Sequence, residues 1–160
     1  MEDFMQFLIR SGMGDRSDFI GCTQAEVATL ESRYRVRLPS SYREFLLLMG
    51  CKAGRFLAGT DCLYGQLMEL DLPKARLDQL LGLQFDWNLP EDAFIFSSHQ
   101  GYIFHCFRTG EGDDPPVYGF AEHEPKLRRS AETFSGFLRN CAWDQLGVAK
   151  KVQSDEPRKP

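Results

Sequence analysis

The sequence predicts a single α+β domain, in which helices pack on a mainly antiparallel, meandering sheet and a C-terminal helix closes the fold. Two helix signals precede residue 50, and strand patterns rich in aromatic residues follow between residues 93 and 120. Helices and strands that are segregated along the chain are typical of the α+β class. With 160 residues, the chain is long enough for one hydrophobic core and too short for two ordinary domains.

Two helices are expected near the start of the chain. Residues 1–13 have a short amphipathic pattern, and the glycines and aspartates after them indicate a loop. Thr23 and Glu26 are spaced as a capping box, in which each side chain bonds the backbone amide of the other residue. The apolar face of the helix that they open is predicted to contain Val27, Leu30 and Tyr34.

The strongest helix signal runs from Leu38 to Gly50. Pro39 fixes the entering backbone, and Ser41 with Glu44 is spaced as a second capping box. Gly50 is expected in the left-handed conformation that ends many helices. One buried face is predicted for the residues at i, i+3, i+4 and i+7, which are Tyr42, Phe45, Leu46 and Met49.

Beyond Gly54 the pattern changes from helical to extended. Short strands are expected at residues 55–58 and 63–70. A small helix is expected to begin at Pro73 and to end at Gly82. These segments would link the helical part of the chain to the main strands.

The clearest strand pattern is a hairpin. Aromatic and β-branched residues at 93–97 and 102–107 flank the polar turn 98–101. An acidic loop rich in Gly and Pro follows at residues 109–116, and residues 117–120 predict a third antiparallel strand.

A last helix is expected from Ala131 to about Leu146. Its apolar face would contain Phe134, Phe137, Leu138 and Cys141. Residues 150–160 have almost no apolar content and are expected to form a disordered tail. The folded domain is therefore predicted to span residues 1–149.

Composition narrows the class of partner. A formal net charge of −4 and a pI near 5.4 argue against a surface for nucleic acid or anionic lipid. Residues 1–10 lack the basic region and long apolar core of a secretion signal, and no segment reaches membrane-spanning length. Five cysteines, without a Cys-x-x-Cys pair, predict neither a disulfide framework nor a zinc ribbon, and the cytoplasm is the expected compartment.

The order of elements and one motif together resemble the SUKH superfamily, which includes the yeast cell-wall synthesis regulator and many bacterial immunity proteins. The likeness extends from about Thr23 to the helix that contains Phe137. It implies a non-enzymatic cytoplasmic domain without a cofactor, which binds another protein, commonly a toxin domain, and neutralises it. The residues that match the family's Leu-Pro-x-x-Tyr-x-x-Phe-Leu motif are Leu38, Pro39, Tyr42, Phe45 and Leu46.

The histidines give no catalytic or metal motif. His99 is expected in the hairpin turn, and His105 is expected to face outwards from its strand. His123 and Glu124 begin like a His-Glu-x-x-His zinc motif, but the second His is absent. His105 and Cys106 are neighbours on one strand, so their side chains point to opposite faces and form no catalytic dyad. Cys106 with His99 stays open as a catalytic thiol–imidazole pair.

Acidic loop residues are the candidate partner-binding surface. Nuclease toxins are basic where they bind phosphates, so an acidic rim can occlude them by charge mimicry. Trp87 is either an interface anchor in this surface or a core residue beside Leu89, and Trp143 either packs on the last helix or closes a dimer contact. The candidate surface comprises Asp86, Trp87, Glu111, Asp113, Asp114, Glu122 and Glu124.

The leading hypothesis is an immunity protein that neutralises a cognate toxin, such as a nuclease, by stoichiometric occlusion. A regulatory scaffold or adaptor of the same fold is the first alternative. A small hydrolase that uses a carboxylate pair such as Asp113 and Glu122 is the second. The immunity hypothesis predicts a one-to-one complex that is weakened by salt and by Asp113→Lys or Glu111→Lys.

Overall fold

The fold was established from a computed structural model that describes residues 1–71, 89–121 and 124–155. The helices of these residues are α1 (Glu2–Arg10), α2 (Gln24–Tyr34), α3 (Ser40–Met49), α4 (Tyr64–Glu69) and α6 (Phe134–Asp155), with a 3₁₀ turn, η1, at Arg16–Asp18. The strands are β1 (Phe19–Ile20), β2 (Lys52–Ala53), β3 (Thr60–Asp61), β4 (Ala93–His99), β5 (Ile103–Arg108), β6 (Val117–Ala121) and β7 (Glu124–Ala131).

The main sheet has the order β3-β4-β5-β6-β7, and every neighbouring pair is antiparallel. It is therefore a meander, as predicted, and the α+β class is confirmed. Strands β1 and β2 form a separate small pair. The expected hairpin and third strand correspond to β4, β5 and β6, whereas β3 and β7 are additional strands at the two edges.

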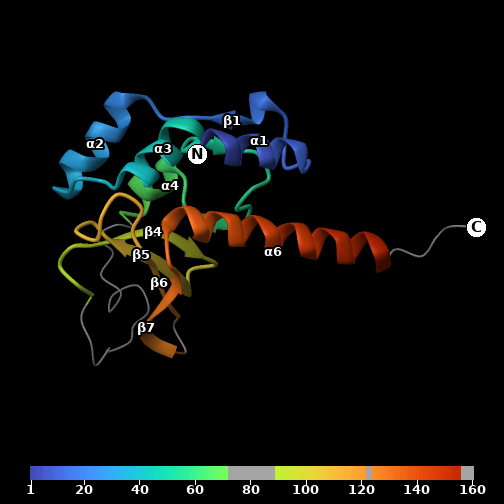
Figure 1. Ribbon diagram of the computed structural model, residues 1–160. Helices are drawn as coiled ribbons and strands as arrows, with labels where there is room; N and C mark the ends of the chain where they lie inside the picture. Colours follow the sequence, from blue (N-terminus) through green and yellow to red (C-terminus); the bar gives the residue numbers. More distant parts are fainter. Residues whose placement is uncertain (72–88, 122–123, 156–160) are drawn as a thin grey trace, which may run out of the picture.

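Helices α3 and α6 cover one face of the sheet (Figure 1). The ring of Tyr42 lies where the three elements meet, with centroids 5.1 Å from Phe107 of β5 and 5.2 Å from Phe134 of α6. Phe94 of β4 stacks on Phe107 at 5.4 Å. Because rings supply large apolar areas without needing hydrogen-bond partners, phenylalanine dominates this core.

The predicted start of α2 is confirmed. The hydroxyl of Thr23 accepts a bond from the amide of Glu26 at 3.2 Å, and the Glu26 carboxylate accepts one from the amide of Thr23 at 2.7 Å. The predicted apolar face of α2 is buried. The short helix expected within residues 1–13 is also present, as α1.

The second predicted capping box, between Ser41 and Glu44, is wrong. Helix α3 begins at Ser40, so Ser41 already lies within its first turn and cannot cap it. The amide of Ser41 donates instead to the carbonyl of Asp113, at 2.9 Å, and Glu44 pairs with the amino terminus at 3.4 Å. A distant loop thus satisfies an amide that the sequence assigned to a local side chain.

The left-handed conformation expected for Gly50 is also wrong, because its φ is −69°. Glycine is required here by space rather than by conformation. A Cβ at this position would lie 2.6 Å from the carbonyl oxygen of Leu46 and 2.8 Å from the sulfur of Cys22.

The segment after Gly54 differs from the prediction. Residues 55–58 form turns rather than a strand, and α4 occupies most of the strand expected at 63–70. The side chain of Gln66 accepts bonds from the amides of Cys62 and Leu63, at 3.1 and 3.0 Å, and so caps α4. The helix expected from Pro73 to Gly82 lies outside the described residues.

The last helix begins later and runs further than predicted. Ala131 is the final residue of β7, and α6 starts at Phe134, where the hydroxyl of Thr133 accepts a bond from the amide of Gly136 at 3.0 Å. The helix continues to Asp155, so residues 150–155 are helical where a disordered tail was expected. In the described part of the chain, no helix is long and apolar enough to cross a bilayer.

Candidate functional site

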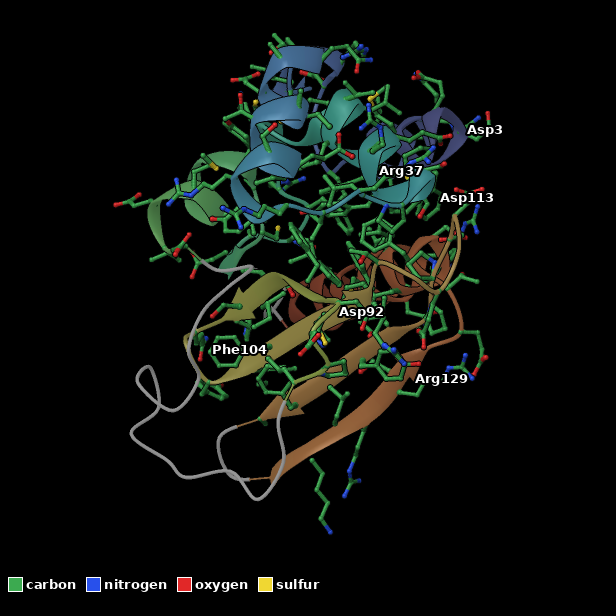
Figure 2. The ribbon with its side chains drawn as sticks, turned by 90° about the vertical axis from the view of Figure 1, so that its left-hand side faces the viewer. Asp3, Arg37, Asp92, Phe104, Asp113 and Arg129 are labelled. Carbon is green, nitrogen blue, oxygen red and sulfur yellow. The ribbon has the colours of Figure 1, made fainter. Side chains whose placement is uncertain are left out.

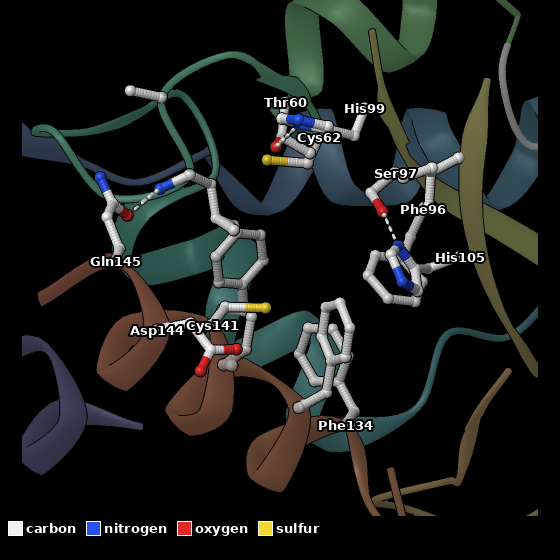
Figure 3. A pocket seen from close by; sticks show the side chains of 16 residues that line it. Thr60, Cys62, Phe96, Ser97, His99, His105, Phe134, Cys141, Asp144 and Gln145 are labelled. Carbon is white, nitrogen blue, oxygen red and sulfur yellow. Dashed lines mark hydrogen bonds between the residues drawn. The ribbon is translucent and has the colours of Figure 1, made fainter. Parts of the chain in front are cut away.

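A largely apolar pocket of about 420 Å³ lies between the sheet and α6 (Figure 3). Its walls come from α3, β3, β4, β5 and α6, and from the residues on either side of β3. The aromatic residues that line it are Phe45, Phe96, Phe134 and Phe137. Concave sites with apolar walls and a few placed polar groups are typical of ligand and side-chain binding.

The polar groups of the pocket are two histidine–hydroxyl pairs and, on α6, Asp144 and Gln145 (Figure 3). Ser97 Oγ is hydrogen-bonded to His105 Nδ1 at 3.1 Å, and Thr60 Oγ1 to His99 Nδ1 at 3.0 Å. Both pairs join neighbouring strands, β4 with β5 and β3 with β4. Each imidazole is therefore held in a fixed direction by a hydroxyl on the adjacent strand.

Burial keeps His105 neutral. Removal from water, together with the nearby His99, lowers the pKa of His105 from 6.5 to about 4. The ring also packs on Phe137, with centroids 4.7 Å apart. Near neutral pH this side chain is an uncharged polar contact rather than a cation.

The thiols of the pocket are neutral as well. Burial raises the pKa of Cys62 and of Cys141 to about 12. Since the thiolate is the reactive form, neither sulfur is an activated nucleophile. Burial also raises the pKa of Cys106 to about 12, and this residue is not among those that line the pocket, which separates it from His99.

Gln145, which lines the pocket, bonds the turn before β3. Its side-chain oxygen accepts a bond from the amide of Leu57 at 3.2 Å, and its nitrogen donates to the carbonyl of Arg55 at 2.6 Å. The turn that precedes β3 is thereby tied to α6. With aromatic and aliphatic walls, and with Asp144 as its acidic residue, the pocket is suited to hold a mainly apolar group by burial.

A family model for the SMI1/KNR4 family (SUKH-1) matches residues 21–140. The chain belongs to the SUKH-1 family. The resemblance found in the sequence is thus confirmed over most of the chain. No match was found among curated proteins.

The motif residues of this SUKH-1 domain have packing roles. Leu38, Tyr42, Phe45 and Leu46 are all buried in the core, and Pro39 is buried next to Leu38. Because these side chains are covered, they stabilise the domain and contact no partner directly. The motif therefore identifies the SUKH-1 fold and says little about function.

The predicted acidic residues of the loop 109–116 all have partners within the chain. Glu111 accepts a bond from the hydroxyl of Tyr118 at 3.0 Å and pairs with Arg108 at 3.4 Å. Asp113 accepts a bond from the hydroxyl of Ser40 at 2.8 Å and remains exposed at the junction of helices and sheet (Figure 2).

Asp114 is similarly engaged, since its carboxylate bonds Ser135 in the first turn of α6. The structure places Asp113 and Asp114 beside α3 and α6 respectively, and none of the three acids lines the pocket.

The remaining candidates fall at or beyond the limits of the described residues. Glu124 begins β7 and pairs in register with Ala121 of β6. The candidates outside the described residues are Asp86, Trp87 and Glu122, and so is His123.

The orientation of His105 was predicted wrongly. It faces the pocket and not the solvent, on the same face of β5 as Phe107. Phe104 and Cys106 alternate with them and are also buried, so β5 is covered on both faces. An alternation of polar and apolar residues predicts which side chains face the solvent only for a strand that has one face in water. The sequence did contain a signal for this orientation, because His105 lies two residues before Phe107 and so shares its face of the strand.

An aromatic patch that the sequence left unassigned lies on α1 and α6. Trp143 is 59% exposed, and one side of its ring packs on Phe7 with centroids 5.2 Å apart. The two rings line an open hollow together with Asp3, Phe4 and Arg139. Phe7 and Trp143 both lie outside residues 21–140, so the two rings of this aromatic patch belong to parts of the chain that the SUKH-1 model does not cover, whereas Arg139 lies within the match.

Proposed function

We propose that this SUKH-1 protein is a non-enzymatic binding domain and that it acts as an immunity protein, which neutralises a cognate bacterial toxin by one-to-one occlusion. The observation that carries the proposal is the family match over residues 21–140. Many bacterial immunity proteins belong to the wider SUKH superfamily. A yeast cell-wall regulator belongs to it too, so an adaptor role is the competing outcome of the experiment below.

The ionisation of the pocket supports binding over turnover. A general base works best with a pKa near the operating pH, whereas the pKa of His105 is lowered to about 4. A thiol nucleophile needs a lowered pKa, whereas the pKa of Cys62 is raised to about 12. These shifts favour neutral, packed side chains, as expected for a scaffold that presents a surface.

The aromatic patch of Asp3, Phe7, Arg139 and Trp143 is the contact surface that we propose for the toxin. Exposed tryptophan next to arginine is the composition that dominates interface energetics. Trp143 is already held on one side by Phe7, so little side-chain entropy is lost when a partner covers the other side.

Charge mimicry by the acidic loop is retained only as a secondary contribution. Asp113 is the exposed member, while Glu111 and Asp114 are engaged within the chain. Glu111 and Asp114 are also partly covered, which leaves less of each carboxylate accessible to a basic toxin than at Asp113. We therefore assign affinity to Trp143 and assign steering of the toxin to Asp113.

The compartment that we propose is the cytoplasm, where an immunity protein meets a toxin that attacks internal targets. The five cysteines are free thiols in the structure. Free thiols are typical of a reducing compartment.

Co-expression tests the proposal directly. The chain is produced together with the toxin domain encoded beside its own gene, and growth is followed along with the mass of the complex. We expect growth to be rescued and the toxin to elute as a one-to-one complex. A complex that leaves the toxin active would favour the adaptor role, and the absence of any complex would overturn the binding proposal.

A further inference from the structure

Three potential metal ligands meet near the start of α2 and the end of α3. The ligand atoms of Cys22, Glu26 and Cys51 all lie within 4.8 Å of one another. The two sulfurs are 3.4 Å apart. Neither the pocket nor the aromatic patch includes these residues, so the proposed function does not explain why they meet.

Backbone hydrogen bonds hold the two cysteine residues close together. The amide of Cys22 donates to the carbonyl of Leu46 at 2.8 Å, and the amide of Cys51 donates to the carbonyl of Ile20 at 2.9 Å. Gly50, directly before Cys51, has no side chain to separate the segments, and a Cβ there would lie 2.8 Å from the sulfur of Cys22. The two thiols are therefore preorganised by the fold before any ligand arrives.

Glu26 has an oxygen to spare. Both of its bonds to Thr23 use Oε2, which accepts from the amide at 2.7 Å and from the hydroxyl at 2.9 Å. Oε1 accepts no bond from the described residues, so it can bind a metal while the cap of α2 stays intact. Two thiolates and a carboxylate also place negative charge beside the positive end of α2.

We propose that Cys22, Glu26 and Cys51 form a Zn²⁺ site, with a water molecule in the fourth position. Thiolate ligands select zinc over magnesium and calcium, and a tetrahedral site of this kind takes sulfur and oxygen ligands together. On binding, each thiol loses its proton to the solvent and its sulfur donates an electron pair to the metal. No electron transfer is involved.

The sulfur separation is closer to that of a metal site than to that of a disulfide. Zinc–sulfur bonds of about 2.3 Å in a tetrahedral site place two sulfurs about 3.8 Å apart, within a few tenths of an ångström of the observed 3.4 Å. A disulfide needs a separation of about 2.05 Å, so the sulfurs would have to approach by more than an ångström. The fold is therefore closer to the geometry of a metal site.

The site would fasten the start of α2 to the end of α3. Because the three ligands come together only in the folded chain, zinc binding would add to the stability of the native state. Its role is thus structural and independent of the toxin contact proposed above.

Titration of the whole protein with Zn²⁺ alone tests the site. The protein is purified with a thiol reductant, stripped with a chelator and titrated by calorimetry, with Co²⁺ as a second probe that gives a sulfur-to-metal charge-transfer band. We expect one metal per chain and a rise in the melting temperature. The absence of the cobalt band in the wild-type protein would overturn the proposal, whatever the variants do.

Variants then identify the ligands. Cys22→Ser and Cys51→Ser are each expected to weaken Zn²⁺ binding at least tenfold and to reduce the cobalt band. Glu26→Gln should weaken binding less, since its amide oxygen can still cap α2. Cys141→Ser removes a half-buried thiol on α6 and serves as the matched control, with unchanged affinity expected. Equal zinc affinity in Cys22→Ser and wild type, or a Cys22–Cys51 disulfide that forms in place of metal binding, would overturn the proposal.

Discussion

The carboxylate of Asp114 caps helix α6 at Ser135, accepting one bond from its amide at 2.9 Å and another from its hydroxyl at 2.6 Å. Asp114 lies in the acidic loop, before β6 and β7, and Ser135 lies after them. The contact therefore closes the part of the chain that contains β6 and the edge strand β7. A residue predicted to bind a partner has a folding role, because unpaired amides at a helix start need acceptors.

Replacement of Asp114 by Ala should destabilise the domain by about 1–2 kcal/mol, the usual effect of removing a helix cap. Urea unfolding measures the change. Asp113→Ala is the matched control, because this neighbouring carboxylate is exposed and accepts one bond from a Ser40 hydroxyl, so its loss should change stability by less than about 0.5 kcal/mol. Equal losses in the two variants would contradict the capping role.

Gly50→Ala should destabilise the domain by about 1–3 kcal/mol, because the added methyl group overlaps the Leu46 carbonyl and the Cys22 sulfur. Gly65→Ala in α4 is the control, since a Cβ there meets no atom within 4 Å among the described residues. The control should raise stability by up to about 1 kcal/mol, because Ala favours a helix over Gly. Thermal unfolding of both variants would show opposite shifts.

His105 should make stability fall between about pH 6.5 and pH 4. Its pKa is about 4 in the folded chain and 6.5 in a free side chain, so the unfolded chain binds the proton first as pH falls. The difference corresponds to on the order of 3 kcal/mol. Stability should be lost through this range and level off below it.

His105→Asn tests this prediction, because it removes the titrating ring. Urea unfolding of wild type and variant at pH 7 and at pH 4.5 isolates its contribution from those of the carboxylates. The wild type should lose more stability than the variant. Parallel losses would show that His105 is not the group responsible.

Trp143→Ala should weaken the toxin complex by at least tenfold, which is the size expected for an aromatic hot spot. Stability should change little, since the side chain is 59% exposed. Tyr102→Ala is the matched control, because Tyr102 is an exposed aromatic residue on the turn between β4 and β5. Calorimetric titration of the toxin domain measures both. An unchanged affinity in the Trp143 variant would show that the interface does not include Trp143 on α6.

The two charge reversals should behave differently. Asp113→Lys should leave stability nearly unchanged and slow association with a basic toxin, most clearly at low salt. Glu111→Lys should destabilise the domain itself, because it places a cation beside Arg108 and removes the acceptor of Tyr118. Stopped-flow association and urea unfolding separate the effects. If the association rate of the wild-type protein does not depend on salt, Asp113 does not steer the toxin.

The sequence by itself determined those features that depend on neighbours along the chain. The capping box of Thr23 and Glu26, the buried face of α3 and the hairpin of β4 and β5 all rest on contacts within a few residues or on a repeating pattern. The motif that points to SUKH belongs to the same class, because its residues are core residues at helical spacing.

Only the tertiary structure decided which distant groups meet. The cap of α6 by Asp114 and the approach of Cys22 to Cys51 each join segments whose spacing along the chain carries no signal. Local patterns report hydrogen bonds and faces within an element. Contacts between elements depend on how whole faces pack, and that packing is set by the core around Tyr42.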